Sequence, residues 1–577
     1  MFVTGYLLEF SKIFDEEPNE FNTYLNGIGN DTIVKFCSHF LSIDLNKPEN
    51  KDPTSFLNNW FSSENADFKN EIEEKIQQLD FDLRKNLVII NVYNILTLFE
   101  YSFNNLSDET ELESNQLEIN LFKCILALNE DFNKRDETIS HSIKHLDKKN
   151  THPAMVLTSS LIYYDLVSYD LREKIISQFI KSIYLFKFLE TYSDATQSLL
   201  SGLTGSFNTS SWREFLIKYL PLVHGLIQPT RQGSLEISIQ QDENSEENIS
   251  FLENISINNE ITIKELDFIK VRTKPFYKNR EYSFRTISPL FTCEKIYEGL
   301  YFLLNKINKD LKNNNEVHVN EDFRGFYCLN FSEEYLLYKI LEKSFPKKYV
   351  RYSGNQLREI NISGEPDYYI RNGNKLFLFE SKDVLISAEI KQSNDFNIIK
   401  DSLEKKFYYY KKDSETHYIG IIQLINNIRK ILKDEYTFDK YNKDKIRIYP
   451  ILITHHSIFN APGINFFINN WYNDELEKLK DENINVENVN PLIIVDIDSF
   501  ILYHEIFKNR TLIFEHLLDE YIERIGLKNN KLQPKTVKQL YSAAVESFST
   551  FLDSKIPEKN KKGAPKLFRD LGLNIFE

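Results

Sequence analysis

The feature that most constrains the fold is an Asn-Gly pair, Asn372-Gly373, between two short runs rich in aromatic and aliphatic residues. Asn-Gly favours a two-residue turn between antiparallel strands, because both turn positions then need a positive φ. The pattern predicts a β-hairpin with strands over residues 366–371 and 375–382.

The turn also predicts which side chains share a face of the hairpin. If Asn372 and Gly373 are the two turn residues, Asp367 lies opposite Leu378. Side chains alternate along a strand, so Asp367, Glu380 and Lys382 point the same way. In this register the two carboxyl-bearing residues are diagonal neighbours, about 7–8 Å apart at the backbone.

The other face of the second strand carries Phe377 and Phe379. A strand that is apolar on both faces is typical of a central, buried position. Charged side chains on such a strand are costly unless something pairs with them. The sequence therefore predicts a charged cluster in a buried place.

Two carboxylates and a lysine in this arrangement suit the hydrolysis of phosphodiesters. Mg²⁺ (or Mn²⁺) prefers oxygen ligands, and we expect Asp367, Glu380 and the carbonyl of Ser381 to supply them. A cation held there lowers the pKa of a bound water and neutralises developing charge. Lys382 is placed to orient that water and to hold the phosphate.

A helix predicted over residues 331–345 precedes the hairpin, with Ser332 as its N-cap. Its apolar face contains Leu336, Leu337, Ile340 and Leu341. Glu333 falls within this face and Glu334 lies at its edge. Because a carboxylate that faces the sheet needs a partner, Glu333 is favoured over Glu334 as a fourth member of the site.

The elements that follow extend the pattern. Residues 349–353 predict a short strand, 383–412 a charged and partly helical insertion, 421–432 a helix, and 445–454 and 491–496 two buried strands. Pro450 lies inside the first of these two strands and predicts a sheet edge or a bulge there. The order of the core elements is αβββαβ.

This segment resembles the PD-(D/E)XK nuclease superfamily, the fold of many restriction endonucleases, over residues 321–505. The motif stands as Pro366-Asp367, then Glu380-Ser381-Lys382. The resemblance implies that Asp367 and Glu380 bind the metal, that Lys382 is catalytic, and that Glu333 or Glu334 assists. The helix with Gln423-Leu424 also matches, and Gln423 either contacts substrate or serves its own helix.

The whole chain is predicted to be an α+β multidomain protein. Residues 1–230 have the apolar periodicity of helices, and residues 231–320 form a small β-rich and helical connecting domain. The restriction-endonuclease-like α/β domain covers residues 321–505, and a helical segment completes the chain over residues 506–577.

The formal charge of −15 is unevenly distributed. Summing Lys and Arg against Asp and Glu gives −15 for residues 1–320, +2 for 321–480 and −2 for 481–577. Acidity of the first half favours contacts with a protein partner or a second copy of the chain over coating of nucleic acid. No apolar run is long enough to span a membrane, and no signal peptide is evident, so we expect a cytoplasmic location.

One basic stretch stands out in the acidic half. Residues 271–280 carry four cations and two aromatics with no acid, which suits nucleic acid, and Lys274 and Arg280 are candidate substrate contacts. An ordinary basic loop is the alternative. Residues 400–412 and 560–569 are weaker patches. The pair His455-His456 is a candidate phosphate contact, with a loop role as the alternative.

The hypothesis from sequence is a metal-dependent nuclease that acts on DNA. By analogy, such a domain joined to a large acidic partner domain suits a regulated effector of a prokaryotic antiviral defence system. One alternative is an RNA-cleaving effector with the same site. The other is a nuclease-like domain that serves as a binding module.

Overall fold

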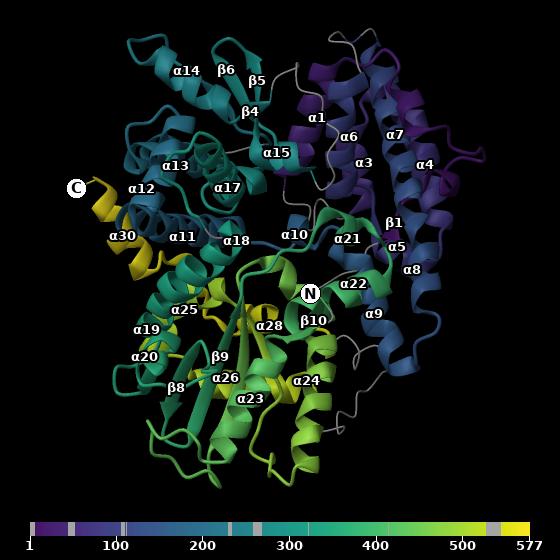
Figure 1. The fold of residues 1–577 in the computed structure, drawn as a ribbon. Helices are drawn as coiled ribbons and strands as arrows, with labels where there is room; N and C mark the ends of the chain where they lie inside the picture. The colour runs from purple at the N-terminus through teal and green to yellow at the C-terminus, as the bar shows by residue number, and fades with distance from the viewer. Residues whose placement is uncertain are drawn as a thin grey trace. The chain divides into compact units, whose positions relative to one another are not determined.

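The computed structural model describes residues 6–43, 52–105, 110, 112–228, 233–257, 268–320, 322–413, 415–526 and 544–576. The protein is α+β and forms two compact units that interleave along the sequence (Figure 1). Unit 1 consists of Met1–Thr138, Leu166–Ile175 and Leu203–Tyr301, and unit 2 of Ile139–Asp165, Ile176–Gly202 and Phe302–Glu577. The domain boundaries expected at residues 231, 321 and 506 stay predictions.

Unit 1 is largely helical, as predicted. Its main helices are α1 (Asn30–Ser42), α3 (Pro53–Trp60), α4 (Ala66–Gln78), α6 (Val92–Asn105), α7 (Ser114–Asn133), α13 (Trp212–Leu226), α14 (Ser245–Asn254), α15 (Ile269–Thr273) and α16 (Pro289–Glu294). On α7, residues three to four apart face inward, and the Phe122 ring meets those of Trp60 and Phe61.

The small sheet predicted in the connecting segment is confirmed, and it belongs to unit 1. It has four strands in the order β3-β6-β5-β4. Their bounds are β3 (Glu236–Ser238), β4 (Ser256–Ile257), β5 (Phe276–Arg280) and β6 (Ser283–Thr286). β5 and β6 pair as an antiparallel hairpin, with a register shift between Lys278 and Arg280.

Unit 2 is built on a five-stranded mixed sheet in the order β13-β12-β9-β8-β7. Figure 1 labels two of its strands, β8 and β9. Its strands are β7 (Val350–Ser353), β8 (Tyr368–Asn372), β9 (Lys375–Lys382), β12 (Arg447–Thr454) and β13 (Ile493–Asp496). β7, β8 and β9 are antiparallel neighbours, whereas β9, β12 and β13 run parallel. The central position predicted for the strand over residues 375–382 is confirmed.

Helices cover the sheet, and the two faces of β9 contact different sets. Leu376 and Leu378 pack in one apolar cluster with α23 (Ile421–Leu432) and α24 (Ile464–Asp481). Phe377 and Phe379 face rings carried by α25 (Ile497–Lys508) and α26 (Phe514–Arg524). Further helices of unit 2 include α9 (Lys148–Leu161), α20 (Gly354–Glu359), α21 (Ala388–Gln392), α22 (Phe396–Phe407) and α28 (Phe548–Lys555).

The predicted hairpin forms, but its register differs by two residues. Asn372 pairs with Lys375 and Tyr368 with Phe379, so Gly373 and Asn374 make the turn. Gly373 has φ +61°, as the first position of a type II′ turn requires. A shift of two residues leaves every side chain on the face predicted for it, because the strand repeat is two.

The edge or bulge expected at Pro450 is wrong. β12 lies between β9 and β13, and Pro450 pairs in register with Leu378. The Ile448 N–H donates to the Asn488 carbonyl, so the missing N–H of Pro450 falls beside Asn490. The hydroxyl of Tyr472 donates to the Asn490 carbonyl instead (3.2 Å), which satisfies the acceptor that proline cannot serve.

The helix before the hairpin begins earlier than predicted. A short helix, α18 (Phe323–Phe326), continues through a π-helix (Tyr327–Leu337) into α19 (Tyr338–Ser344). Asp322 caps α18 by accepting from the Arg324 and Gly325 amides. The N-cap predicted at Ser332 is therefore wrong, because this residue is inside a helix and its hydroxyl bonds to Asp383.

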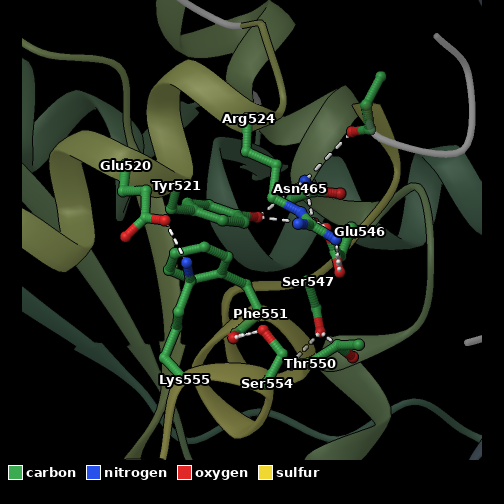
Figure 2. Close-up of polar contacts among 11 residues, drawn as sticks. Asn465, Glu520, Tyr521, Arg524, Glu546, Ser547, Thr550, Phe551, Ser554 and Lys555 are labelled. Carbon is green, nitrogen blue, oxygen red and sulfur yellow. Dashed lines mark hydrogen bonds and ion pairs between the residues drawn. The ribbon is translucent and has the colours of Figure 1, made fainter. Parts of the chain in front are cut away.

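The C-terminal helices are joined to the sheet domain by polar contacts, some buried and some exposed (Figure 2). The Tyr521 hydroxyl donates to the Glu546 carbonyl (2.7 Å) and accepts from the Asn465 amide of α24 (3.1 Å). Arg524 pairs with the Glu546 carboxylate at 2.5 Å. Ser547 caps α28 by accepting from the Thr550 amide. These bonds connect α24, α26 and α28 within unit 2.

Candidate functional site

Asp367 lies one residue before β8, at the end of the hairpin away from the turn. The hairpin register, continued by one pair, places it opposite Glu380 rather than diagonal to it. The Ser381 amide donates to Asp367 Oδ2 (2.6 Å), and the Gly354 amide donates to the Asp367 carbonyl (2.8 Å). Both the backbone and the carboxylate of Asp367 are therefore held in place.

Glu380 is the deepest member of the cluster, with 0% of its surface exposed. Lys382 Nζ contacts Glu380 Oε1 at 2.7 Å, which confirms that these two side chains share a face. Glu380 Oε2 is buried and has no hydrogen-bond partner in the described chain. A buried carboxylate oxygen without a donor is rare in proteins and marks a place for a missing ligand.

The structure also brings Glu333 to this cluster. The Tyr338 hydroxyl donates to Glu333 Oε1 (3.2 Å). Burial, followed by the charges of Asp367 and Glu380, raises the pKa of Glu333 to about 9. The alternative residue, Glu334, instead pairs with Arg358 at 2.6 Å.

Arg358 also forms an ion pair with Glu365, another carboxylate near the motif. Its guanidinium pairs with Glu365 at 2.8 Å and with Glu334, so both acids have a cation. The cluster of Asp367, Glu380 and Glu333 has Lys382 as its closest cation.

The protonation of the cluster follows from its burial. Burial and the neighbouring Asp367 raise the pKa of Glu380 to about 8. Burial likewise raises the pKa of Asp367, although Lys382 opposes it. The Lys382 amine has its pKa raised by Glu380 and Asp367 despite the opposing effect of burial. Without a cation, the three carboxyl groups therefore retain protons that they would ordinarily lose.

The donor set fits a small hard cation. Asp367 and Glu380 offer carboxylate oxygens at one place, and Glu380 Oε2 has no competing donor. In the part of the chain that the structure describes, no group of three or more His, Cys, Asp or Glu side chains is already arranged as a complete metal site. Two carboxylates plus waters are an ordinary set for Mg²⁺, which keeps several waters. The Ser381 carbonyl stays a predicted ligand.

Close packing positions the Lys382 side chain. A Cβ on Gly420 would lie 3.5 Å from Lys382 Cε and only 2.6 Å from the Phe407 carbonyl oxygen. Gly420 has φ +46°, which side chains with a Cβ rarely adopt. A glycine at this position lets the loop before α23 approach the lysine stem.

A second polar network adjoins the cluster, and the sequence analysis missed it. Asp383 directly follows Lys382, and its carboxylate contacts Arg324 (2.6 Å), His456 (3.2 Å) and the Ser332 hydroxyl. Burial opposes its ionisation, yet His456 and Arg324 hold the pKa of Asp383 well below its usual value. The adjacency of Asp383 to the motif lysine was the only signal in the sequence.

The two histidines predicted as phosphate contacts or loop residues have partners in the structure. His455 Nε2 is 2.9 Å from the Ser381 hydroxyl, and burial lowers the pKa of His455 to about 4. His456 contacts Asp383. Thr454 pairs with Lys382 across β12 and β9, and its buried hydroxyl has no partner in the described chain.

The roles of the three predicted substrate contacts stay predictions. The Gln423 side chain accepts from the Gly420 amide (2.7 Å), so its carbonyl oxygen caps α23. Lys274 follows α15 and is half-buried, and Arg280 is exposed at the end of β5. Both basic residues belong to unit 1, whereas the carboxylate cluster belongs to unit 2.

The burial and mutual repulsion of the carboxylates predict a measurable gain of stability when one of them is neutralised. Because burial raises the pKa of Glu380 to about 8, Glu380→Gln should raise the free energy of unfolding of the metal-free protein at about pH 8 by about 1–4 kcal/mol. Lys382 keeps Asp367 as a neighbouring carboxylate, so the change removes repulsion without leaving an isolated cation. Urea unfolding in EDTA measures the effect.

The control for this prediction is Glu365→Gln. That variant breaks the pair with Arg358 and is expected to have unchanged or slightly lower stability. If Glu380→Gln instead lowers the free energy of unfolding, the Glu380 carboxylate stabilises the metal-free protein, and the prediction is wrong.

Comparison with known proteins gave no match to a protein-family model, to a curated protein or to a solved structure. Among the long helices in the described part of the chain, none contains an apolar stretch of the kind that crosses a lipid bilayer.

Proposed function

We propose that the chain is a metal-dependent nuclease of the PD-(D/E)XK type that hydrolyses phosphodiester bonds in DNA. The observation that carries the proposal is the cluster at the ends of β8 and β9. Asp367, Glu380 and Glu333 converge there on one amine, and Glu380 Oε2 is buried without a partner.

The element order of unit 2 supports the same reading. A helix, three antiparallel strands, a helix and two further strands occur in this order as α19, β7, β8, β9, α23, β12 and β13, with other helices and a small hairpin inserted between some of them. The strand that carries the motif is central and parallel to β12. An active site at the end of a central strand, on a rigid scaffold, suits precise positioning of catalytic groups.

Each residue has a defined task in this proposal. Asp367 and Glu380 would hold Mg²⁺, which would supply an activated water and neutralise charge on the phosphate. Asp367 is fixed in its orientation by the Ser381 amide. Lys382 Nζ, which donates to Glu380 Oε1, is an ammonium that would also donate to the attacking water or to a phosphate oxygen. Glu333, whose pKa is raised to about 9, holds a proton that it can donate, while its Oε1 accepts from the Tyr338 hydroxyl.

The metal ligands alone do not distinguish DNA from RNA, so substrate choice needs a direct assay. Matched single- and double-stranded DNA and RNA are incubated with the protein and Mg²⁺ or Mn²⁺. Faster cleavage of DNA supports the proposal, and exclusive cleavage of RNA replaces it with an RNA-cleaving effector. Tight binding of either without cleavage favours a nuclease-like binding module.

The regulated role in antiviral defence is a proposal that rests on analogy and on the charge of the chain. Residues 1–320 carry a net charge of −15 and the remainder is neutral. An acidic half repels nucleic acid and suits a partner protein or a second copy of the chain.

Metal binding should strengthen as the pH rises. Glu380 and Glu333 have pKa values raised to about 8 and about 9, and a carboxyl group must lose its proton before it binds a metal. We expect the apparent affinity for Mn²⁺ to rise by up to ~10-fold per pH unit below about pH 8, and to level off above about pH 9. Calorimetric titrations at a series of pH values measure this.

The stability of the metal-free protein should change in the opposite direction. The folded carboxyl groups keep protons that the unfolded chain releases above its ordinary pKa of 4.5. The free energy of unfolding therefore falls as the pH rises from about 4.5 towards about 9. A Mn²⁺ affinity that does not change with pH between about 4.5 and 9 would contradict the raised pKa values of Glu380 and Glu333.

A further inference from the structure

A small two-stranded hairpin lies between α22 and α23 in the chain, outside the five-stranded sheet. Its strands are β10 (Tyr409–Lys412) and β11 (Glu415–Tyr418), which pair antiparallel. We call these two strands the arm. The arm belongs to unit 2, as the carboxylate cluster does, so contacts between the two lie within one unit.

Both ends of the arm lie beside the motif lysine. The Ile419 amide donates to the Tyr408 carbonyl (3.0 Å), which closes the base of the hairpin. The next residues outward, Phe407 and Gly420, meet so closely that a Cβ on Gly420 would lie 2.6 Å from the Phe407 carbonyl oxygen. The same Cβ would lie 3.5 Å from Lys382 Cε. The arm therefore begins and ends next to the Lys382 side chain.

Contacts with α24 hold the base of the arm. The Tyr408 hydroxyl donates to the Glu475 carboxylate, and the Tyr408 ring lies nearly parallel to that of Trp471, at 12° with centroids 6.1 Å apart. Tyr409 meets Tyr408 edge to face, with centroids 4.9 Å apart. Tyr418 lies opposite Tyr409 across the hairpin and is 60% exposed. A large aromatic ring is thus presented to solvent on an anchored support.

The arm is basic as well as aromatic. Residues 405–412 contain four lysines, three tyrosines and no acid. Lys411 and Lys412 end β10 and are exposed. Asp413 and Glu415 follow them in the chain, and neither acid forms an ion pair with any residue that the structure describes. The arm therefore offers exposed positive charge close to the cluster.

The two faces of the arm have a similar composition. Side chains alternate along a strand, so Tyr418 and Lys411 point to one face. On the other face Tyr410 and His417 are directly opposed, and their rings stack at 13° with centroids 4.9 Å apart. Lys412 follows on that face. Each face therefore combines aromatic rings with a lysine.

We propose that the arm binds a stretch of nucleic acid with unpaired bases, directly beside the phosphate that is cleaved. The inference rests on the proposed nuclease function for the position of that phosphate. Lysines neutralise backbone phosphates and exposed aromatic rings stack on bases, which is the combination that holds single strands. Bases within a closed duplex are covered by their neighbours, so Tyr418 stacks on an unpaired base.

Charge and position both favour nucleic acid over a protein partner. Lysine is depleted in protein–protein interfaces, whereas it supplies much of the affinity for phosphate backbones. A polymer with one phosphate in the carboxylate cluster has its flanking phosphates close to Lys382. The arm starts at that point, so it is within reach of the same strand.

The first test measures binding of a labelled single-stranded DNA oligonucleotide to the full chain in EDTA, where metal-dependent cleavage does not occur. Tyr418→Ala should weaken binding at least ~5-fold, because it removes the stacking of one base. Tyr418→Phe keeps the ring and should bind like the wild type. Replacing Lys411 and Lys412 together with methionine should lower the slope of log Kd against log salt concentration by about 1.4, since each phosphate contact on a single strand contributes about 0.7.

The matched control replaces Lys347 and Lys348 together with methionine. These adjacent lysines are also exposed, but they precede β7 at the end of the sheet away from Asp367. The control should keep the wild-type salt slope. A wild type that does not bind the single strand, full binding by Tyr418→Ala, or an equal loss of slope in the control would overturn the proposal. A loss in Tyr418→Ala that is as large for a blunt duplex as for the single strand would contradict stacking on unpaired bases.

The second test measures cleavage of the same strand in saturating Mg²⁺, which separates the arm from the nuclease site. In Tyr418→Ala the KM should rise at least ~5-fold while kcat stays within about twofold, because the carboxylate cluster is unchanged. If the wild type cleaves and the arm variants keep its KM, the arm inference is wrong and the proposed function stands. If the arm variants lose binding but the wild type cleaves no nucleic acid, the proposed function is wrong and the arm stands as a nucleic-acid surface.

Discussion

Replacing Lys382 with methionine is expected to lower the rate of Mg²⁺-dependent cleavage by about 10³-fold and to leave metal affinity nearly unchanged. Lys382 Nζ is the closest cation to Asp367, Glu380 and Glu333, and its stem is fixed beside Gly420. Methionine keeps an unbranched stem of similar length but cannot donate to water or phosphate. Single-turnover kinetics at saturating metal measure the loss.

Lys375→Met provides the control for this result. Lys375 lies at the opposite end of the same strand, about 4 Å from Glu515. Its replacement should leave the cleavage rate within about twofold. A Lys382→Met protein that keeps wild-type turnover would show that the amine is structural. A parallel loss in Lys375→Met would point to the fold of β9 instead.

Replacing Asp367 with asparagine is expected to weaken Mn²⁺ binding by at least ~100-fold. Changes to groups that only orient metal ligands already cost about 10–100-fold in affinity, and a direct ligand should cost more. Asparagine has nearly the same shape and retains an oxygen that can accept from the Ser381 amide, so the hairpin should persist. Calorimetric titration of the metal-free protein with Mn²⁺ measures the change.

Glu365→Gln is the matched control for this prediction. Glu365 lies two residues before Asp367, and its carboxylate pairs with Arg358. The Glu365→Gln protein should bind Mn²⁺ with the same affinity as the wild type. Unchanged binding in Asp367→Asn would remove this residue from the metal site.

The sequence predicted the shared face of the cluster better than its register. Asn372-Gly373 signals a two-residue turn, but a shift by two residues costs little in local terms and leaves each side chain on the same face. Gly373 at the first turn position satisfies the positive φ equally well. Contacts outside the hairpin, such as that of Asn372 with the Tyr349 hydroxyl, are invisible to local patterns.

Contacts between residues far apart in the sequence also explain the wrong predictions for Ser332 and Pro450. Serine is a common N-cap residue, yet the Ser332 hydroxyl bonds to Asp383, 51 residues away. Pro450 disfavours a central strand locally, but Tyr472 satisfies the carbonyl that proline leaves open. The bounds of the strand over residues 375–382 and of the helix over residues 421–432 were predicted correctly. A continuous apolar run after the turn signals the strand, and strong apolar periodicity signals the helix.

The most direct test of the account is cleavage of supercoiled plasmid by the full chain in Mg²⁺ or Mn²⁺, beside Lys382→Met and Asp367→Asn purified identically. The account predicts nicked or linear product with the wild type, its loss in EDTA, and at least ~10³-fold less product with either variant. Cleavage that persists in both variants, or a wild type that cuts no DNA or RNA with either metal, would contradict it.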